Sequence, residues 1–358
     1  MTCVGITCMA LPAFTIQHGR PLPGDRMGHV TMHPALSDRL LALPYRDPVH
    51  DGATDPVLVA DPASGSWLMF YTQRRAAASG LDGVAWVHGT GIGVARSDDG
   101  GMTWSYEGVV EGLDAPGLAR PVTRWAPDVV RIGDRWVMFL TLLGGHRTDW
   151  TGPARIAQYT STDLRAWAFQ AYLDLDSERV IDAAVTRCGD GLYRLWYKDE
   201  TRGSRTYAAV TATPCLPSTW EVEGLVIDGR PHEGPKVFVL GGWYWMITDE
   251  WRGLAVYRSL DGTGGWERQK RDDGLVLRMP ETFEGLPVVA RHADVVVQED
   301  RAAIVYFTHP QWAGADLGDM EGEATGTAHR RSHIRAAWFD VSPAGELLPS
   351  DRPTGGLR

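Results

Sequence analysis

A β-rich unit repeats five times along the 358-residue chain, and this repeat limits the possible fold more than any other feature. Each copy places two apolar runs around a polar or glycine-containing turn and ends in an aromatic residue, a pattern that predicts a β-hairpin. The copies are TDPVLVADPASGSWLMFYT, APDVVRIGDRWVMFLT, IDAAVTRCGDGLYRLWY, EGPKVFVLGGWYWMIT and HADVVVQEDRAAIVYFT. Self-similarity of this kind predicts a repeat architecture.

A second hairpin, built from a small-residue strand, a turn and a tryptophan, follows the first in four copies. These are GIGVARSDDGGMTW, RIAQYTSTDLRAW, TYAAVTATPCLPSTW and GLAVYRSLDGTGGW, and HIRAAWFDVSPAGELL completes the last copy. Two hairpins make the four strands of one propeller blade, and the copies recur about every 50 to 70 residues. We therefore predict an all-β, five-bladed β-propeller over residues 45–358, with helical patterning limited to residues 35–43.

Residues 1–44 precede the repeats and read as an extended N-terminal arm that lies over the propeller. The arm contains Pro12, Pro21, Pro23 and Pro34. Its apolar run over residues 3–14 lacks a basic segment and a clear small-residue cleavage site, so a signal peptide is not favoured. No later stretch reaches the roughly 20 apolar residues of a membrane helix. We expect a cytoplasmic protein without a membrane partner, with secretion as the alternative.

Charge and composition narrow the range of partners. Lys and Arg total 35 against 45 Asp and Glu, and the basic residues are scattered, which argues against a nucleic-acid partner. The four cysteines have no metal-ligand spacing, so we interpret them as free thiols. The 15 tryptophans suit a protein in which most pack between sheets while a few offer flat faces to sugars.

Acidic residues recur where the inner strands of the propeller are expected to begin. These starts converge on one central depression because neighbouring strands of a blade are antiparallel. They carry Asp55, Asp128, Asp182, Glu233 and His292, while the ends of the second strands carry Gln73, Arg74, His146, Lys198, Asp199, Asp249, Trp251, His309 and Trp312. An Asp before Pro is also common turn chemistry. Four acids in one register, however, must repel one another, which indicates a function such as catalysis or cation binding.

Glycoside hydrolysis needs such a set of acids. One carboxylic acid donates a proton to the leaving oxygen, and a carboxylate on the other side of the sugar acts as base or nucleophile. A third acid can raise the pKa of the proton donor through like-charge repulsion.

Five motifs resemble glycoside hydrolase family 43 and its five-bladed relatives in families 32, 62, 68 and 117. They are TDP at 54–56, WAPDV at 125–129, VID at 180–182, EGPKV at 233–237 and RHADVV at 291–296. The resemblance implies that Asp55 is the general base, Asp128 the residue that tunes pKa, and Glu233 the general acid. It implies an inverting, exo-acting enzyme for arabinofuranosides, xylosides or galactosides, with an oligosaccharide or polysaccharide as substrate. We expect substrate contacts from Arg74, Trp125, His146, Asp182, Trp251, His309 and Trp312.

His292 resembles the axial histidine of this family, which implies a structural Ca²⁺ held largely by water in the central channel. The alternative is a core histidine bonded to the backbone. Two features depart from the family: the third blade reads IDAAV without a proline after the aspartate, and no accessory β-sandwich follows the propeller.

Two other functions stay open. The segment SDDGGMTW at 97–104 fits the Asp-box turn of sialidases and other propellers, in which Asp99 bonds the loop backbone and Trp104 packs beneath. A sialidase would also need arginines for the substrate carboxylate, and Arg74, Arg124 and Arg291 are the candidates. The other alternative is a catalytically silent propeller that binds carbohydrate.

Overall fold

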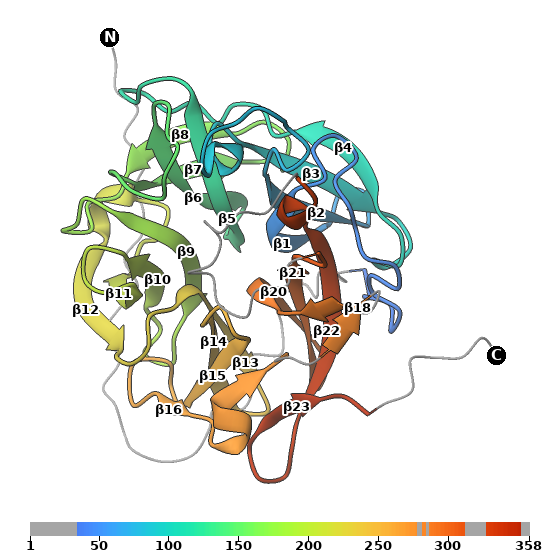
Figure 1. Cartoon of the computed structure of the whole chain (residues 1–358). Helices are drawn as coiled ribbons and strands as arrows, with labels where there is room; N and C mark the ends of the chain where they lie inside the picture. Colours follow the sequence, from blue (N-terminus) through green and yellow to red (C-terminus); the bar gives the residue numbers. More distant parts are fainter. Residues whose placement is uncertain (1–33, 278–280, 284–285, 312–326, 352–358) are drawn as a thin grey trace. The chain divides into compact units, whose positions relative to one another are not determined.

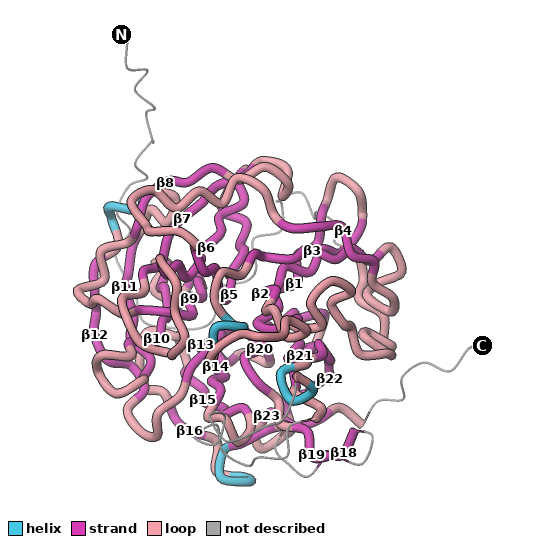
Figure 2. The backbone as a smooth tube through the Cα atoms, turned by 45° about the horizontal axis from the view of Figure 1, so that its top comes forward, coloured by secondary structure: helices cyan, strands magenta, loops and turns pink. Residues whose placement is uncertain are grey.

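The protein is a five-bladed β-propeller, seen in a computed structural model that describes residues 34–277, 281–283, 286–311 and 327–351. Five antiparallel sheets are arranged around a centre in Figure 1, and strands make up most of the regular backbone in Figure 2. The predicted fold class is confirmed. This fold class follows from the short strands, in which apolar residues either alternate with polar ones or form continuous runs. Such strands bury one or both faces against the neighbouring blade.

Each blade is formed by four consecutive strands in sequence order. Blade 1 contains β1 (Ala53–Asp61), β2 (Ser66–Gln73), β3 (Gly91–Ser97) and β4 (Ser105–Val109). Blade 2 contains β5 (Val122–Ile132), β6 (Arg135–Gly144), β7 (Arg155–Ser161) and β8 (Ala168–Tyr172). Blade 3 contains β9 (Val180–Arg187), β10 (Tyr193–Asp199), β11 (Arg205–Thr211) and β12 (Glu221–Ile227). Blade 4 contains β13 (Glu233–Leu240), β14 (Trp243–Asp249), β15 (Leu254–Ser259) and β16 (Glu267–Arg268), and β17 (Leu275–Val276) pairs with β15. Blade 5 contains β20 (Arg291–Gln298), β21 (Arg301–Thr308), β22 (His333–Val341) and β23 (Leu347–Pro349).

The remaining elements are small. A separate hairpin pairs β18 (Glu281–Phe283) with β19 (Leu286–Val288). Short 3₁₀ turns are η1 (Ala85–Val87), η2 (Pro217–Thr219), η3 (Arg271–Gly274) and η5 (Ala328–Arg330). Within the described ranges, no helix is long and apolar enough to cross a membrane.

The N-terminal arm is described from residue 34 onward, and its earlier part lies outside the described residues. Helical patterning at 35–43 does not produce a helix, because residues 38–43 form turns. Leu36, Leu40 and Leu41 are buried against blades 1 and 5, and Tyr45 bridges to Ile334 of β22. Tertiary burial of three leucines therefore fixes this segment without helical hydrogen bonds.

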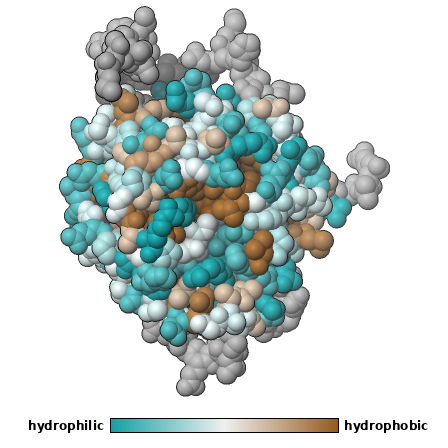
Figure 3. Space-filling model, turned by 90° about the horizontal axis from the view of Figure 1, so that it is seen from above, coloured by the Kyte–Doolittle hydropathy of each residue, from teal (hydrophilic) through white to brown (hydrophobic). Residues whose placement is uncertain are grey.

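The hydrophobic core lies between neighbouring blades rather than at one centre. Phe70 of blade 1 packs edge-to-face on Trp167 of blade 2, and Trp196 and Trp245 are fully buried in blades 3 and 4. Hydrophilic residues dominate the face in Figure 3, where hydrophobic residues gather in a smaller area near the middle. Most tryptophans thus serve packing, as expected from burial of large aromatic surfaces.

The Asp-box turn has the expected geometry. Asp99 accepts hydrogen bonds from the backbone N–H of Thr103 at 3.0 Å and from the Ser97 hydroxyl at 2.7 Å. Trp104 donates from Nε1 to the Gly101 carbonyl at 2.9 Å and packs against the core cluster of blade 1. The box therefore closes an outer hairpin and has no place in the central site.

Candidate active site

The first strands of the blades contact one another in the circular order β1, β5, β9, β13, β20 and back to β1. Each first strand contains a β-bulge near its start, where the pairing register with the second strand shifts by one residue. A bulge redirects the side chains before it. The residues at the bulge, in blade order, are Asp55, Ala126, Asp182, Gly234 and His292.

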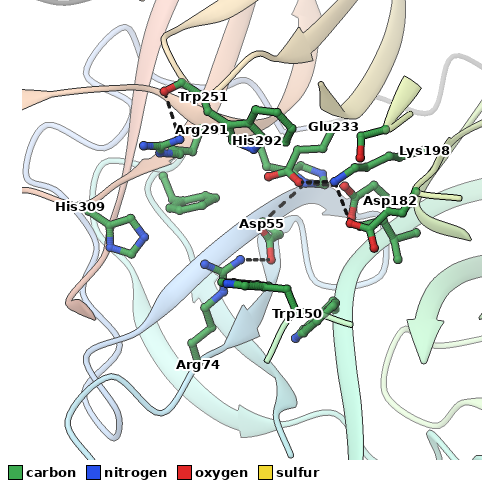
Figure 4. Close-up of a pocket in the computed structure, with 15 residues that line it drawn as sticks. Asp55, Arg74, Trp150, Asp182, Lys198, Glu233, Trp251, Arg291, His292 and His309 are labelled. Carbon is green, nitrogen blue, oxygen red and sulfur yellow. Dashed lines mark hydrogen bonds and ion pairs between the residues drawn. The ribbon is translucent and has the colours of Figure 1, made fainter. Parts of the chain in front are cut away.

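A cavity of about 370 Å³ opens at these bulges. Among the residues that line it are eight that the sequence predicts: Asp55, Arg74, Trp125, Asp182, Glu233, Trp251, His292 and His309. Figure 4 shows Asp55, Asp182, Glu233 and His292 gathered near one another, each from the first strand of a different blade. The circular order of the blades thus brings residues 254 positions apart, Asp55 and His309, to one pocket.

Two of the acids stand in an uncommon backbone conformation. Asp55 has a φ of 50° and Asp182 a φ of 60°, in the left-handed region that costs most side chains free energy. The Asp182 N–H donates to Thr141 Oγ1 at 3.0 Å, and the equivalent Ala126 N–H donates to Thr72 Oγ1 at 2.8 Å. Each bond comes from the preceding blade and holds one bulge in place, and the bond to Thr141 thereby aims the Asp182 carboxylate at the cavity.

Glu233 belongs to a chain of charged groups. Its Oε2 lies 3.0 Å from Lys198 Nζ, which also lies 2.9 Å from Glu200, and Glu200 pairs with Arg179. Burial opposes ionisation of Glu233, but the adjacent Lys198 ammonium outweighs this effect and holds the pKa of Glu233 at about 2. In the free protein Glu233 is therefore a carboxylate at neutral pH.

In contrast to Glu233, both Asp182 and His292 have a raised pKa and so tend to hold a proton. Burial raises the pKa of Asp182 to about 7; His292 opposes this shift and the neighbouring Glu233 adds to it. Burial alone would lower the pKa of His292, but Asp182 and Asp55 outweigh it and raise that pKa. The imidazole Nδ1 lies 3.8 Å from Asp55 Oδ1 and 3.9 Å from Asp182 Oδ2, so it bridges the two acids.

Aromatic rings form the walls. Trp125 is fixed by a hydrogen bond from Nε1 to the Val87 carbonyl at 2.7 Å, and its ring centroid lies 6.1 Å from that of Trp150. Trp251 faces Lys198, whose Nζ lies 5.2 Å from the ring centroid. Flat rings beside carboxylates and cations suit a sugar, which has apolar faces and a polar edge.

Asp128 lies outside this pocket, and its expected register is wrong. The pairing of β5 with β6 places Ala126 at the bulge, so Asp128 is two residues farther along the strand, at the level of Lys236 and Asp294. Asp128 Oδ1 lies 2.6 Å from Lys236 Nζ, and Asp294 Oδ1 lies 2.8 Å from the same atom. We call these three residues the channel triad. In TDP the aspartate occupies the bulge and the proline follows it. In WAPDV the alanine occupies the bulge and the aspartate comes only after the proline, which explains the mistaken alignment.

Two other expected residues do not contribute. His146 is exposed and lies away from the lining, because the loop after β6 directs Trp150 toward the cavity instead. Trp312 lies outside the described residues. The expected substrate contacts omit Lys198, Glu200 and Trp150, although Lys198 stands at the predicted end of a second strand, and Arg291 was expected there only for the sialidase alternative.

The described side chains do not fit a calcium ion. Within the described ranges no group of three or more His, Cys, Asp and Glu side chains is placed to hold a metal. Each acid pair near the axis also faces a basic side chain already: His292 lies between Asp55 and Asp182, and Lys236 lies between Asp128 and Asp294. Calcium stays a prediction of the sequence resemblance.

No protein-family model matches the sequence, and no curated protein matches it either. Solved structures do resemble it. A thermostable family-43 glycoside hydrolase is 16% identical with a TM-score of 0.62, and the match covers 88% of this chain and 98% of that one. A family-43 β-1,3-galactosidase with galactodeoxynojirimycin is 16% identical with a TM-score of 0.61, over 86% and 96% of the two chains. A family-43 enzyme from Xanthomonas citri complexed with xylose is 16% identical with a TM-score of 0.60, over 89% and 97%. The chain thus has the five-bladed propeller fold of family-43 glycoside hydrolases.

Proposed function

We propose that the protein is a glycoside hydrolase that removes a terminal sugar from an oligosaccharide or polysaccharide. The observation that carries this proposal is the convergence of Asp55, Asp182 and Glu233, from blades 1, 3 and 4, in one pocket with aromatic walls. The cavity of about 370 Å³ falls in the range of about 300 to 1,000 Å³ usual for small-ligand sites. Its size favours a single terminal unit over a long stretch of polymer.

We assign the base to Asp55 and the acid to Glu233 together with Asp182. Asp55 and Glu233 belong to blades 1 and 4, which blade 5 separates, so they approach a bound sugar from different sides. Arg74 Nη2 lies 3.5 Å from Asp55 Oδ2, so a guanidinium group stands beside the proposed base. In glycosidases generally, a base and an acid about 6.5 to 9.5 Å apart give inversion at the anomeric carbon. The placement of Asp55 and Glu233 on blades 1 and 4 suits this longer separation.

The proton for the leaving oxygen is stored by the Asp182 and Glu233 pair. Burial raises the pKa of Asp182 to about 7, so in the free protein Asp182 holds this proton near neutral pH while Lys198 keeps Glu233 ionised. In the reaction Glu233 takes up the proton from Asp182 and donates it to the leaving oxygen. Strongly interacting acids titrate as a pair. Asp182 thereby takes the tuning role that the sequence resemblance gives to Asp128.

Paired aryl glycosides test the proposal. Asp55→Asn should abolish hydrolysis of both nitrophenyl and simple alkyl glycosides, because activation of water is needed for each. Glu233→Gln should spare activated aryl substrates and lose the alkyl ones by about 10² to 10⁴-fold, the usual range for acid catalysis. Asp61→Asn is the matched control, since Asp61 is an equally buried aspartate at the far end of β1.

The results separate an enzyme from a binding protein. No hydrolysis of any glycoside by the wild type, with retained sugar binding in calorimetry, would favour a silent carbohydrate-binding propeller. Proton NMR of the first-formed sugar tests the stereochemistry, and initial release of the anomer found in the substrate would reject inversion. Equal activity of Asp55→Asn and Asp61→Asn would remove Asp55 from the mechanism.

A further inference from the structure

The pocket is divided by charge. Lys198, Asp182 and Glu233 gather on one side in Figure 4, and His309, Arg291 and Arg74 lie on the other. The acids of the first side have the Lys198 ammonium as a close partner, at 3.0 Å from Glu233. The second side contains the guanidinium groups of Arg74 and Arg291, and Asp55 is the carboxylate of the pocket lining that lies next to Arg74.

Arg74 holds a guanidinium group in a largely buried position. Its side chain is 13% exposed, and its backbone N–H donates to the Gly52 carbonyl at 2.8 Å. The guanidinium carbon lies 5.3 Å from the ring centroid of Phe307, and Nη2 lies 3.5 Å from Asp55, beyond a good hydrogen bond. Within the described part of the chain, Nε is buried without a hydrogen-bond partner. A buried donor without a partner costs free energy, which an incoming acceptor would recover.

Arg291 reaches the same region from blade 5. It is the first residue of β20, pairs in register with Phe307 and is 4% exposed. Its Nη1 donates to the Trp251 carbonyl at 3.2 Å, which fixes the guanidinium at the pocket wall. Phe307 is therefore flanked by two arginines that come from different blades.

His309 completes this side without adding charge. Its Nδ1 lies 2.9 Å from the Arg331 carbonyl, which can only accept, so Nδ1 carries the proton and Nε2 is the acceptor nitrogen. Burial, with Arg74 and Arg291 next, lowers the pKa of His309 to about 3. Two fixed cations and a neutral acceptor suit a ligand that presents both a carboxylate and hydroxyl groups.

We propose that the sugar at the cleavage site is a uronic acid, whose carboxylate is bound by Arg74 and Arg291. The proposal rests on the glycoside hydrolase function and names its substrate class. Guanidinium groups bind carboxylates through paired, charge-assisted hydrogen bonds. The acids on the opposite side would repel the carboxylate, so it points to blades 1 and 5 and leaves the anomeric carbon near Asp55 and Glu233. Arg124, by contrast, bonds the Leu113 carbonyl outside the pocket, so the arginine trio of a sialidase is not assembled.

Matched substrates test this specificity. Nitrophenyl glucuronide and galacturonide, in both anomeric forms, are compared with the glucoside and galactoside that differ only at the carboxylate. We expect at least a 100-fold higher kcat/KM for one uronide than for its neutral partner. Arg291→Gln should reduce this ratio at least 30-fold, and Arg131→Gln, a surface arginine on blade 2, should leave it unchanged.

The outcomes distinguish this inference from the function on which it rests. Preferred hydrolysis of neutral glycosides would overturn the uronic acid and keep the hydrolase. If no glycoside is cleaved, calorimetry with free D-glucuronate and D-glucose decides: binding of glucuronate alone, lost in Arg291→Gln, would retain the carboxylate site and reject the hydrolase. Equal binding or none would overturn the carboxylate site. An unchanged substrate ratio in Arg291→Gln would also overturn it.

Discussion

Lys236→Met should destabilise the protein by breaking the channel triad at its centre. The ammonium lies 2.6 Å from Asp128 Oδ1 and 2.8 Å from Asp294 Oδ1, and all three side chains are largely buried. The second oxygen of each aspartate accepts a backbone N–H, Val185 for Asp128 and Leu58 for Asp294, at 2.8 Å in both cases. The triad therefore connects all five blades around the axis.

The magnitude follows from the charges left behind. Removing one partner of a buried ion pair costs about 3 to 5 kcal/mol, because the remaining charge stays buried without compensation. Here two carboxylates lose the same cation and also repel each other. We expect a loss of about 4 kcal/mol at pH 8 and a smaller loss at pH 5, because protonation relieves an uncompensated buried carboxylate.

Urea unfolding followed by tryptophan fluorescence measures this loss at both pH values. Lys270→Met is the matched control, since Lys270 is exposed and should change the free energy of unfolding by less than about 0.5 kcal/mol. Adding Asp128→Asn and Asp294→Asn to Lys236→Met should restore at least half of the stability, because the amides keep accepting the two backbone N–H groups. A Lys236→Met loss below about 1 kcal/mol at pH 8, equal at pH 5, would refute the reasoning.

Four further predictions concern the pocket and the channel. Asp128→Asn should lower stability but leave turnover per folded molecule within a few-fold of the wild type. Asp182→Asn should lower turnover by orders of magnitude. The reverse result would return the tuning role to Asp128. Because the pKa of Asp182 is raised by burial to about 7, its ionisation costs stability as pH rises from about 4 to 7, so Asp182→Asn should melt above the wild type at pH 8, with the gap closing at pH 4. Trp251→Ala should weaken sugar binding by about 1 to 3 kcal/mol in calorimetry, since its backbone bonds to Asp249 and Arg291 remain, and an unchanged affinity would make the ring a packing residue. A chelator should leave activity and melting temperature unchanged, and loss of either with recovery on adding Ca²⁺ would place a calcium ion in the channel.

The sequence alone determined the propeller and most of the pocket. Hairpins with apolar runs have few ways to bury their faces. Five copies of the first hairpin, each followed by a second hairpin, specify five blades. Asp55, Asp182 and Glu233 were found because the first strand of every blade begins at the same end of the ring. The Asp-box was found because its hydrogen bonds are local and depend on residues 97–104 alone.

Only the tertiary structure decided which acids share the pocket. Asp128 stands two residues past the bulge of β5, so its carboxylate meets Lys236 and not the pocket. No local pattern places Lys198 against Glu233, or Arg291 in one pocket with Arg74, because these residues come from different blades. The same is true of Lys236, which reads as an ordinary polar residue of a strand until blades 2, 4 and 5 meet around it. Protonation is likewise set by burial and by neighbours brought together through ring closure, so the sequence indicates the acids while the fold determines which of them holds the proton.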